Sequence, residues 1–141
     1  MSNMQLDTLR RIVQEINASV SLHDSLDIMV NHVAEAMHVD VCSIYLLDER
    51  NKRYVLMASK GLKPEAVGHV SLSVGEGLVG LVGKREEIVN LDNAPKHERF
   101  AYLPETGEEL FNSFLGVPVM YRRKVMGVLV VQNKESQDFS E

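Results

Sequence analysis

Two segments near the end of the chain, residues 114–122 and 125–133, are apolar on both of their faces. Successive side chains of a strand point to opposite sides of a sheet. In the second segment Val128 and Val130 would therefore point one way and Leu129 the other. An antiparallel sheet with one wet face would instead carry polar residues at alternate positions. We expect a sheet that is covered on both faces.

The first forty residues have a helical period and supply the cover for one face. Residues 4–20 carry five apolar side chains spaced three and four apart, as on one side of a helix. Such a stripe packs either on the chain's own sheet or on the same stripe of a second copy, as a dimer interface. A second helix is expected to start near Ser21 and Asp24, which resemble a capping box, and to end near residues 38–40. The stripe residues are Leu6, Leu9, Val13, Ile16 and Val20.

The rest of the chain predicts strands, one short helix and one long loop. Residues 75–83 indicate a turn that leads into a glycine-rich helix, and residues 92–112 a polar loop or lid. The predicted fold class is α+β: a central antiparallel sheet with N-terminal helices on one face and a ligand pocket under short helices and loops on the other. The expected strands are residues 41–48, 53–60, 69–74, 88–91, 114–122 and 125–133.

Composition excludes several classes of protein. Fifteen Lys and Arg against twenty Asp and Glu give a net charge of −5, which argues against binding to nucleic acid or to an anionic membrane. There is no apolar run of bilayer length and no apolar core of a secretory signal. The single cysteine, Cys42, fits a reducing compartment. We expect one cytoplasmic domain, with helices in 1–40, sheet and pocket in 41–135, and a truncated C-terminal helix starting in 136–141.

No motif predicts a catalytic or metal site. The segment GEGLVG at residues 75–80 matches G-x-G-x-x-G, but it follows a predicted hairpin, so its glycines indicate a tight turn and close helix–sheet packing more than a dinucleotide site. The five histidines lack metal-ligand spacing, and there is no second cysteine. The basic turn at residues 122–124 serves either solubility or docking to an acidic partner.

The order of these segments resembles a GAF domain. The resemblance rests on the GEGLVG helix start, the exit NLDNA, and the strands SFLGVPV and GVLVVQ, and it runs from about Leu6 to the end. The segments VCSIYLLD and YVLMASKGL are similar to the N-terminal GAF domain of the nitrogen-type Enzyme I family, the phosphoenolpyruvate-protein phosphotransferases. The alternatives are a GAF domain of another signalling protein, or a dimerisation module without a ligand.

This resemblance implies a regulatory role for the fragment and an enzymatic role for its parent. Phosphoryl transfer, with its phosphorylated histidine and its magnesium, would belong to downstream domains of the same chain, and the fragment itself would need no cofactor. The family implies a nitrogen-status metabolite, such as glutamine, as the ligand. Cyclic nucleotides fit poorly, because residues 102–104 are Tyr-Leu-Pro where that branch of the family has Asp-Glu.

A bound amino acid would need donors for its carboxylate and an acid for its ammonium group. We expect Asp92 to take the ammonium, and ligand binding to order the lid at residues 92–112 and to bias the connection to the downstream domains. The other expected contacts are the amides of Gly77, Leu78 and Val79 and a closing cation, Lys96 or Arg99, for the carboxylate, and an apolar wall of Tyr45, Phe100, Tyr102, Leu115 and Val117.

Overall fold

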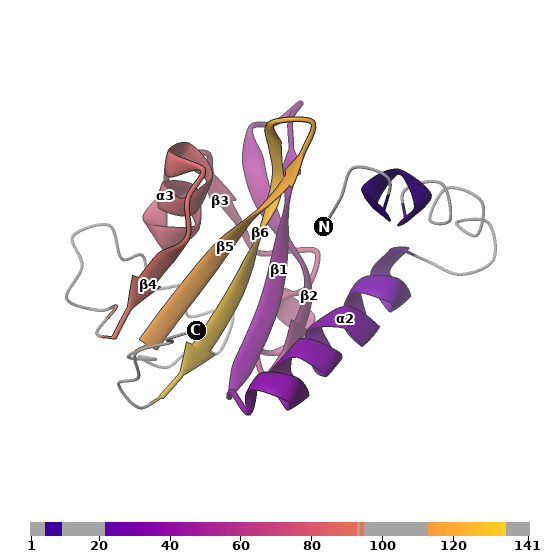
Figure 1. Cartoon of the computed structure of the whole chain (residues 1–141), viewed down its shortest axis with the longest axis vertical. Helices are drawn as coiled ribbons and strands as arrows, with labels where there is room; N and C mark the ends of the chain where they lie inside the picture. The colour runs from indigo at the N-terminus through magenta and orange to yellow at the C-terminus, as the bar shows by residue number, and fades with distance from the viewer. Residues whose placement is uncertain (1–4, 10–21, 93, 95–112, 135–141) are drawn as a thin grey trace.

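The computed structural model describes residues 5–9, 22–92, 94 and 113–134 of the chain. These residues form one six-stranded antiparallel sheet in the order β3-β2-β1-β6-β5-β4, with one long helix, one short helix and a helical segment at residues 5–9 (Figure 1). The elements are α2 (Leu22–Met37), β1 (Val41–Asp48), β2 (Arg53–Lys60), the 3-10 turn η1 (Pro64–Ala66), β3 (Ser71–Ser73), α3 (Gly77–Arg85), β4 (Val89–Leu91), β5 (Ser113–Tyr121) and β6 (Lys124–Asn133). The predicted α+β class is confirmed.

The helix α2 covers one face of the sheet and α3 the other, as the two-faced apolar strands predict (Figure 1). The cluster beneath α2 is the smaller one, and its buried members are Val30, Ala34, Cys42, Ile44, Ala58 and Val131. The cluster on the α3 side is larger and includes Tyr45, Tyr54, Leu56, Leu78, Val79, Val82, Phe114, Val128 and Val130.

A β-bulge in β2 moves part of that strand to the opposite face. In the pairing with β1, Leu56 lies opposite Tyr45 and Ala58 lies opposite the adjacent residue Ile44. Met57 is therefore the extra residue of β2. Leu56 therefore packs on the α3 side and Ala58 on the α2 side, although their spacing of two would place them together in a regular strand. The His23 ring at the start of α2 donates a 2.9 Å hydrogen bond to the Met57 carbonyl, which ties the helix to the bulge.

Most element boundaries agree with the sequence prediction, and two differ for visible reasons. The third strand, expected over residues 69–74, is shortened to Ser71–Ser73. The amides of His69 and Val70 both donate to the Ala66 carbonyl, so η1 continues into a turn that keeps them out of the ladder. The helix predicted within 75–83 begins at Gly77 and continues to Arg85.

The first and last described strands pair at the centre of the sheet. In the β1–β6 ladder Val41 lies opposite Gln132. Next to this pair, the Asp40 amide donates to Asn133 Oδ1 at 2.7 Å, and the Lys134 amide donates to Asp40 Oδ2 at 2.9 Å. These bonds fasten the end of β6 to the corner between α2 and β1.

Two of the predicted helices lie partly or wholly outside the described residues. Of the helix expected over residues 4–20, residues 5–9 are helical, while Val13, Ile16 and Val20 are outside the described part. The helix expected to start within residues 136–141 is outside it as well.

Candidate functional site

The helix α3 begins on a tight glycine turn. Gly75 and Gly77 have φ of +90° and +66°, a left-handed conformation that glycine adopts without steric cost. A Cβ atom on Gly80 would lie 2.5 Å from the carbonyl carbon of Gly75, so the first turn of the helix rests directly on that backbone. The predicted tight turn is confirmed, while the close contact of Gly80 is with the backbone of that turn and not with the sheet.

The N-terminus of α3 presents the three amides that the sequence predicts as carboxylate donors. Gly80 makes the first helical hydrogen bond, to the Glu76 carbonyl at 3.0 Å. The N–H groups of Gly77, Leu78 and Val79 precede it, so they have no acceptor within the helix. All three residues are buried, and this end of a helix favours negative charge.

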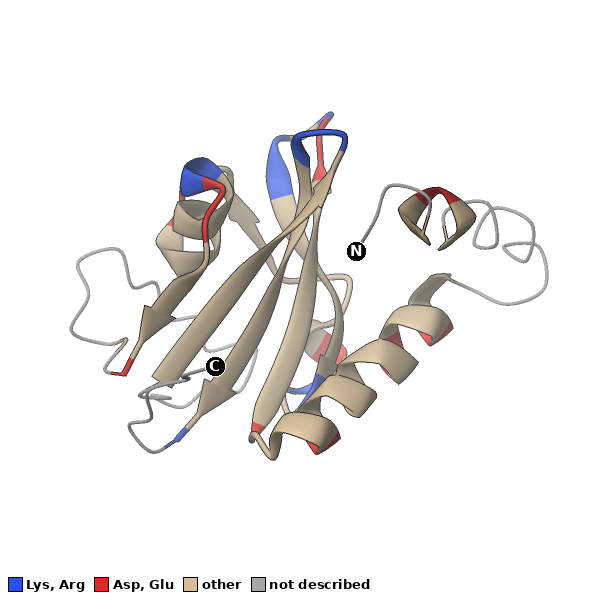
Figure 2. Cartoon of the chain, viewed as in Figure 1, with Lys and Arg blue, Asp and Glu red and all other residues tan. Residues whose placement is uncertain are grey.

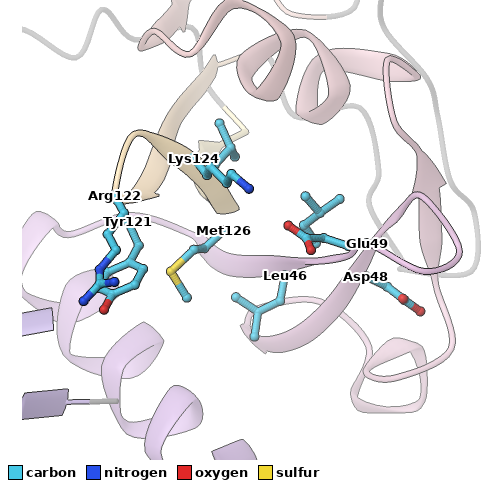
Figure 3. A pocket seen from close by; sticks show the side chains of 9 residues that line it. Leu46, Asp48, Glu49, Tyr121, Arg122, Lys124 and Met126 are labelled. Carbon is cyan, nitrogen blue, oxygen red and sulfur yellow. The ribbon is translucent and has the colours of Figure 1, made fainter. Parts of the chain in front are cut away.

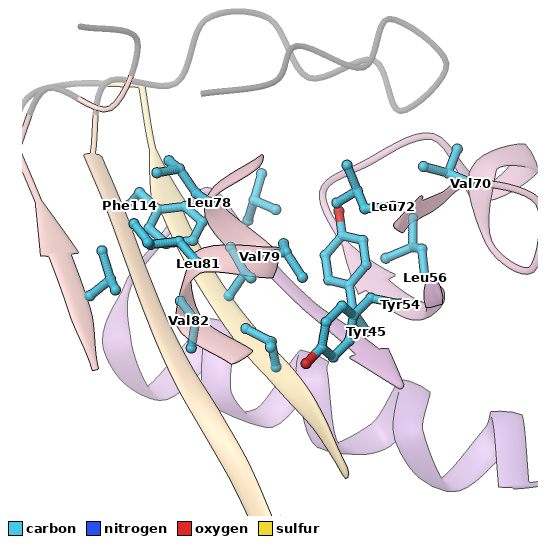
Figure 4. Packing of buried hydrophobic residues seen from close by; sticks show 14 of the residues in the cluster. Tyr45, Tyr54, Leu56, Val70, Leu72, Leu78, Val79, Leu81, Val82 and Phe114 are labelled. Carbon is cyan, nitrogen blue, oxygen red and sulfur yellow. The ribbon is translucent and has the colours of Figure 1, made fainter. Parts of the chain in front are cut away.

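An apolar wall lies beneath α3 and contains part of the predicted site (Figure 4). Tyr45, Leu78 and Val79 are each at most 5% exposed and belong to one buried cluster. Phe114 joins the same cluster from β5. The structure therefore places these three predicted residues in one buried cluster, in which Leu78 and Val79 belong to the first turn of α3 and Tyr45 to β1.

Leu115 lies on the opposite side of the sheet, which corrects the predicted wall. Its side chain packs against the cluster beneath α2. Val117 follows it by two residues and pairs with Leu129, another residue of the α2 side, so alternation places Val117 on that face too. A site beside α3 uses Phe114 of β5 instead. Both faces of β5 are apolar, so the sequence did not distinguish them.

The remaining predicted contacts are one exposed acid and four residues outside the described part. Asp92 directly follows β4 and is exposed. Its chain neighbour two residues on, Ala94, is buried in the α3-side cluster, so Asp92 lies at the margin of that cluster. Lys96, Arg99, Phe100 and Tyr102 lie within the residues that the structure does not describe.

Sequence reasoning missed Tyr54, which packs against the second half of α3. A Cβ atom on Gly83 would lie 2.7 Å from Tyr54 Cζ, so Gly83 leaves the space that this ring occupies. Burial raises the pKa of Tyr54, and the negative charge of Glu86 adds to the effect. The hydroxyl is therefore a neutral group that supports α3. The sequence did carry a signal for its burial. Tyr54 and Leu56 are two residues apart in β2, so their side chains lie on the same side of the strand.

A separate pocket of about 620 Å³ lies between the ends of the β1–β2 and β5–β6 hairpins (Figure 3). Its lining mixes charges of both signs around apolar residues, and the basic residues gather at the hairpin tip (Figure 2). The side chain and amide of Asn51 donate to Asp48 and hold the pKa of that carboxyl below its usual range. Of the predicted ligand contacts that the structure describes, none lines this pocket. Its lining residues are Leu46, Leu47, Asp48, Glu49, Tyr121, Arg122, Lys124, Val125 and Met126.

The thiol of Cys42 is unsuited to nucleophilic chemistry. The residue is fully buried in the α2-side cluster, and burial raises its pKa from 9.0 to about 11. A reactive cysteine needs the opposite shift. Within the described part of the chain, no three His, Cys, Asp or Glu residues are grouped as a metal site would require.

The raised pKa of Cys42 predicts a loss of stability at alkaline pH. Between about pH 9 and 11 the unfolded chain loses the thiol proton and the folded chain keeps it, so the free energy of unfolding falls as the pH rises. We expect this cysteine to account for a loss of about 1 kcal/mol between pH 8 and pH 10. Urea unfolding at the two pH values should show a smaller loss for Cys42→Ala than for the natural chain; equal losses would contradict the prediction.

A comparison with protein-family models matches residues 21–141 to the GAF domain. The chain belongs to the GAF domain family. Among solved structures, this GAF domain matches the GAF domain of an Acinetobacter phosphoenolpyruvate-protein phosphotransferase, with 81% identity and a TM-score of 0.77 over all of this chain and 84% of that one. The corresponding GAF domain from Coxiella burnetii is 43% identical, with a TM-score of 0.81 and the same coverage.

A curated relative of this GAF domain is several times longer than the chain. The chain is 44% identical over 136 residues to the Escherichia coli K12 protein described as phosphoenolpyruvate-dependent phosphotransferase system. The match covers 96% of this chain but only 18% of the relative. Among the described residues of the GAF domain, no helix is both long and apolar enough to cross a bilayer.

Proposed function

We propose that this chain is the regulatory GAF domain of a phosphoenolpyruvate-protein phosphotransferase of the nitrogen branch, acting in the cytoplasm. The observation that carries the proposal is the 44% identity to the Escherichia coli relative over 96% of this chain. Since that match takes up 18% of the relative, the phosphorylated histidine and its magnesium are assigned to the remainder of the parent. The fragment itself is a sensor and needs no cofactor.

The proposed ligand is a free amino acid that reports nitrogen status, with glutamine as the first candidate. Support comes from the amides at the start of α3 that have no acceptor within the helix, the apolar wall of Tyr45, Leu78 and Val79, and the acid Asp92 at the margin of that wall. The amides complement a carboxylate, and Asp92 complements an ammonium group. Lys96, Arg99, Phe100 and Tyr102 remain proposed contacts.

Replacing Asp92 by alanine is expected to weaken glutamine binding about tenfold, because the ammonium group loses its charged partner. The test is isothermal titration of L-glutamine into the natural chain and the variant. Glu87→Ala is the matched control, because it removes an exposed acid at the other end of β4. Equal affinity of Asp92→Ala and the natural chain would remove Asp92 from the site.

The proposed regulation acts on the parent protein. Ligand binding orders residues 92–112 over the site and shifts the connection to the downstream domains. The ligand changes phosphoryl transfer only if its affinity differs between the two conformations of that connection. The test is phosphoryl transfer from phosphoenolpyruvate by the full-length protein, with and without glutamine. A rate that glutamine leaves unchanged at saturation would contradict this regulation.

A second proposed role is assembly, through the stripe that begins with Leu6 and Leu9. Leu9 is 46% exposed, which favours pairing with a second copy over packing on the chain's own sheet. If glutamine, 2-oxoglutarate and cyclic nucleotides all fail to bind in calorimetry while the chain still dimerises, the domain is an assembly module without a ligand.

A further inference from the structure

The tip of the β5–β6 hairpin holds the N-terminal helical turn by one carboxylate. The Tyr121 hydroxyl donates to Asp7 Oδ1, and Arg122 Nη2 lies 3.9 Å from the same oxygen. The Arg122 guanidinium also lies 5.2 Å from the centroid of the Tyr121 ring. The Tyr121 hydroxyl therefore donates to an oxygen that also pairs with the guanidinium lying over the Tyr121 ring. We call this contact of Asp7 with Tyr121 and Arg122 the tip clamp.

The backbone of the turn shows that the arginine is placed there against local preference. Arg122 and Arg123 have φ of +50° and +66°, which is the conformation of a two-residue type I′ turn between β5 and β6. Asn-Gly builds such a turn at lower conformational cost than two side chains of this size. The sequence instead has Arg122 and Arg123 in this turn, and the tip clamp gives Arg122 a structural role.

The tip clamp also sets the direction in which the first two stripe residues, Leu6 and Leu9, point. At about 100° per residue, Leu9 lies about 200° around the helix from Asp7, and Leu6 lies about 100° from it in the other direction. With Asp7 turned toward the hairpin tip, Leu9 points away from it, in agreement with its 46% exposure. Leu6 lies between these directions and is half-buried.

The rest of the stripe lies outside the described residues, and only the sequence period bears on its direction. If the helical period continues as the sequence predicts, all five stripe residues fall about 180–260° from Asp7. In heptad terms the stripe occupies positions a and d, and Asp7 occupies position b, which does not face a partner helix. The residues at positions e and g are Gln5, Arg10, Ile12, Asn17 and Ser19. With one charge among them, two such helices meet without rows of like charges.

We propose that the hairpin tip is a docking surface for the N-terminal helix of its own chain, and that it orients the apolar stripe toward the same stripe of a second copy. The inference rests on the assembly role proposed above and adds the element that controls it. The clamp acts by preorganisation, because only chains with the helix held outward are competent to pair. Tyr121 and Arg122 are therefore positioning residues that affect the dimer without contacting the second copy.

The test is sedimentation equilibrium of the 141-residue chain and three variants. Losing one exposed polar contact lowers the competent fraction of each chain roughly two- to threefold. Since a dimer needs two competent chains, Arg122→Gln and Tyr121→Phe should each raise the dimer dissociation constant about four- to ninefold. Arg123→Gln is the matched control, with the same charge change in the same left-handed turn, and should stay within about twofold. Amides of residues 5–9 should also exchange faster in Arg122→Gln than in Arg123→Gln.

The outcomes separate the inference from the role on which it rests. A natural chain that stays monomeric at about 1 mM would overturn the assembly role and with it the orientation toward a second copy. A natural chain that dimerises, with Arg122→Gln and Tyr121→Phe equal to it in dissociation constant, would overturn the clamp and leave the dimer standing. Glutamine affinity should be the same in all four proteins, since the clamp is remote from α3.

Discussion

Replacing Gly80 by alanine is expected to destabilise the domain by about 3 kcal/mol, although alanine is the better helix former. The gain in helix propensity is about 1 kcal/mol. Against it, the new Cβ would lie 2.5 Å from the carbonyl carbon of Gly75 and 2.8 Å from its Cα and N. These are backbone atoms of a tight turn and cannot rotate away, so α3 must lift off the turn, at an overpacking cost above the usual 1–3 kcal/mol.

Urea unfolding of Gly80→Ala measures this cost, with Gly68→Ala as the control. Gly68 has a φ of +83°, but among the described residues no atom beyond its chain neighbours lies within 4 Å of the position that a Cβ would take there. Alanine at Gly68 is therefore expected to cost only the backbone conformation, about 1 kcal/mol. Displacement of α3 should also weaken glutamine binding, since the three amides at its start move with it. A Gly80→Ala variant as stable as the natural chain would contradict the close packing of the helix on the turn.

Replacing Phe114 by alanine is expected to cost about 3–5 kcal/mol of stability, because the ring is 3% exposed and its removal leaves a cavity beneath α3. For a domain of this size the midpoint of thermal unfolding should fall by about 10 °C or more. We also expect glutamine affinity to fall, because Phe114 belongs to the same wall as Leu78 and Val79.

The adjacent residue provides the control for this prediction. Leu115 is half-buried on the α2 side, so Leu115→Ala should cost about 1–2 kcal/mol, with glutamine affinity within twofold of the natural chain. Calorimetry on both variants, at a temperature where each is folded, distinguishes the two faces. A loss of affinity in Leu115→Ala equal to that in Phe114→Ala would contradict a site on the α3 side.

The architecture could be predicted from the sequence because each layer has a strong local signal. The strands β1 and β2 have the expected bounds, Val41–Asp48 and Arg53–Lys60, because a charged turn separates two clear runs of β-forming residues. The helix α2 starts and ends where its apolar period does. Coverage of both faces followed from the lack of polar residues at alternate positions.

The sequence could not predict which of two equally apolar faces a side chain joins. In β5 the choice between Phe114 and Leu115 depends on the pairing with β6, which is a long-range contact. In β2 the bulge at Met57 reverses the facing of the residues that follow it, and no local residue type marks its place. For the site, the glycine motif predicted the helix N-terminus whose first three amides have no acceptor within α3. The packing of Tyr54 against Gly83 needed the tertiary structure.

The pairing of β1 with β6 at the middle of the sheet has a consequence for the order in which the protein is made. Val41 leaves the ribosome some ninety residues before its partner Gln132. Until then one edge of β1 keeps its backbone N–H and C=O groups without their β6 partners, which is a route to aggregation. The domain can complete its core only when synthesis has passed residue 133, and mutations that slow pairing of β6 should reduce the yield of folded protein in the cell more than its stability once folded.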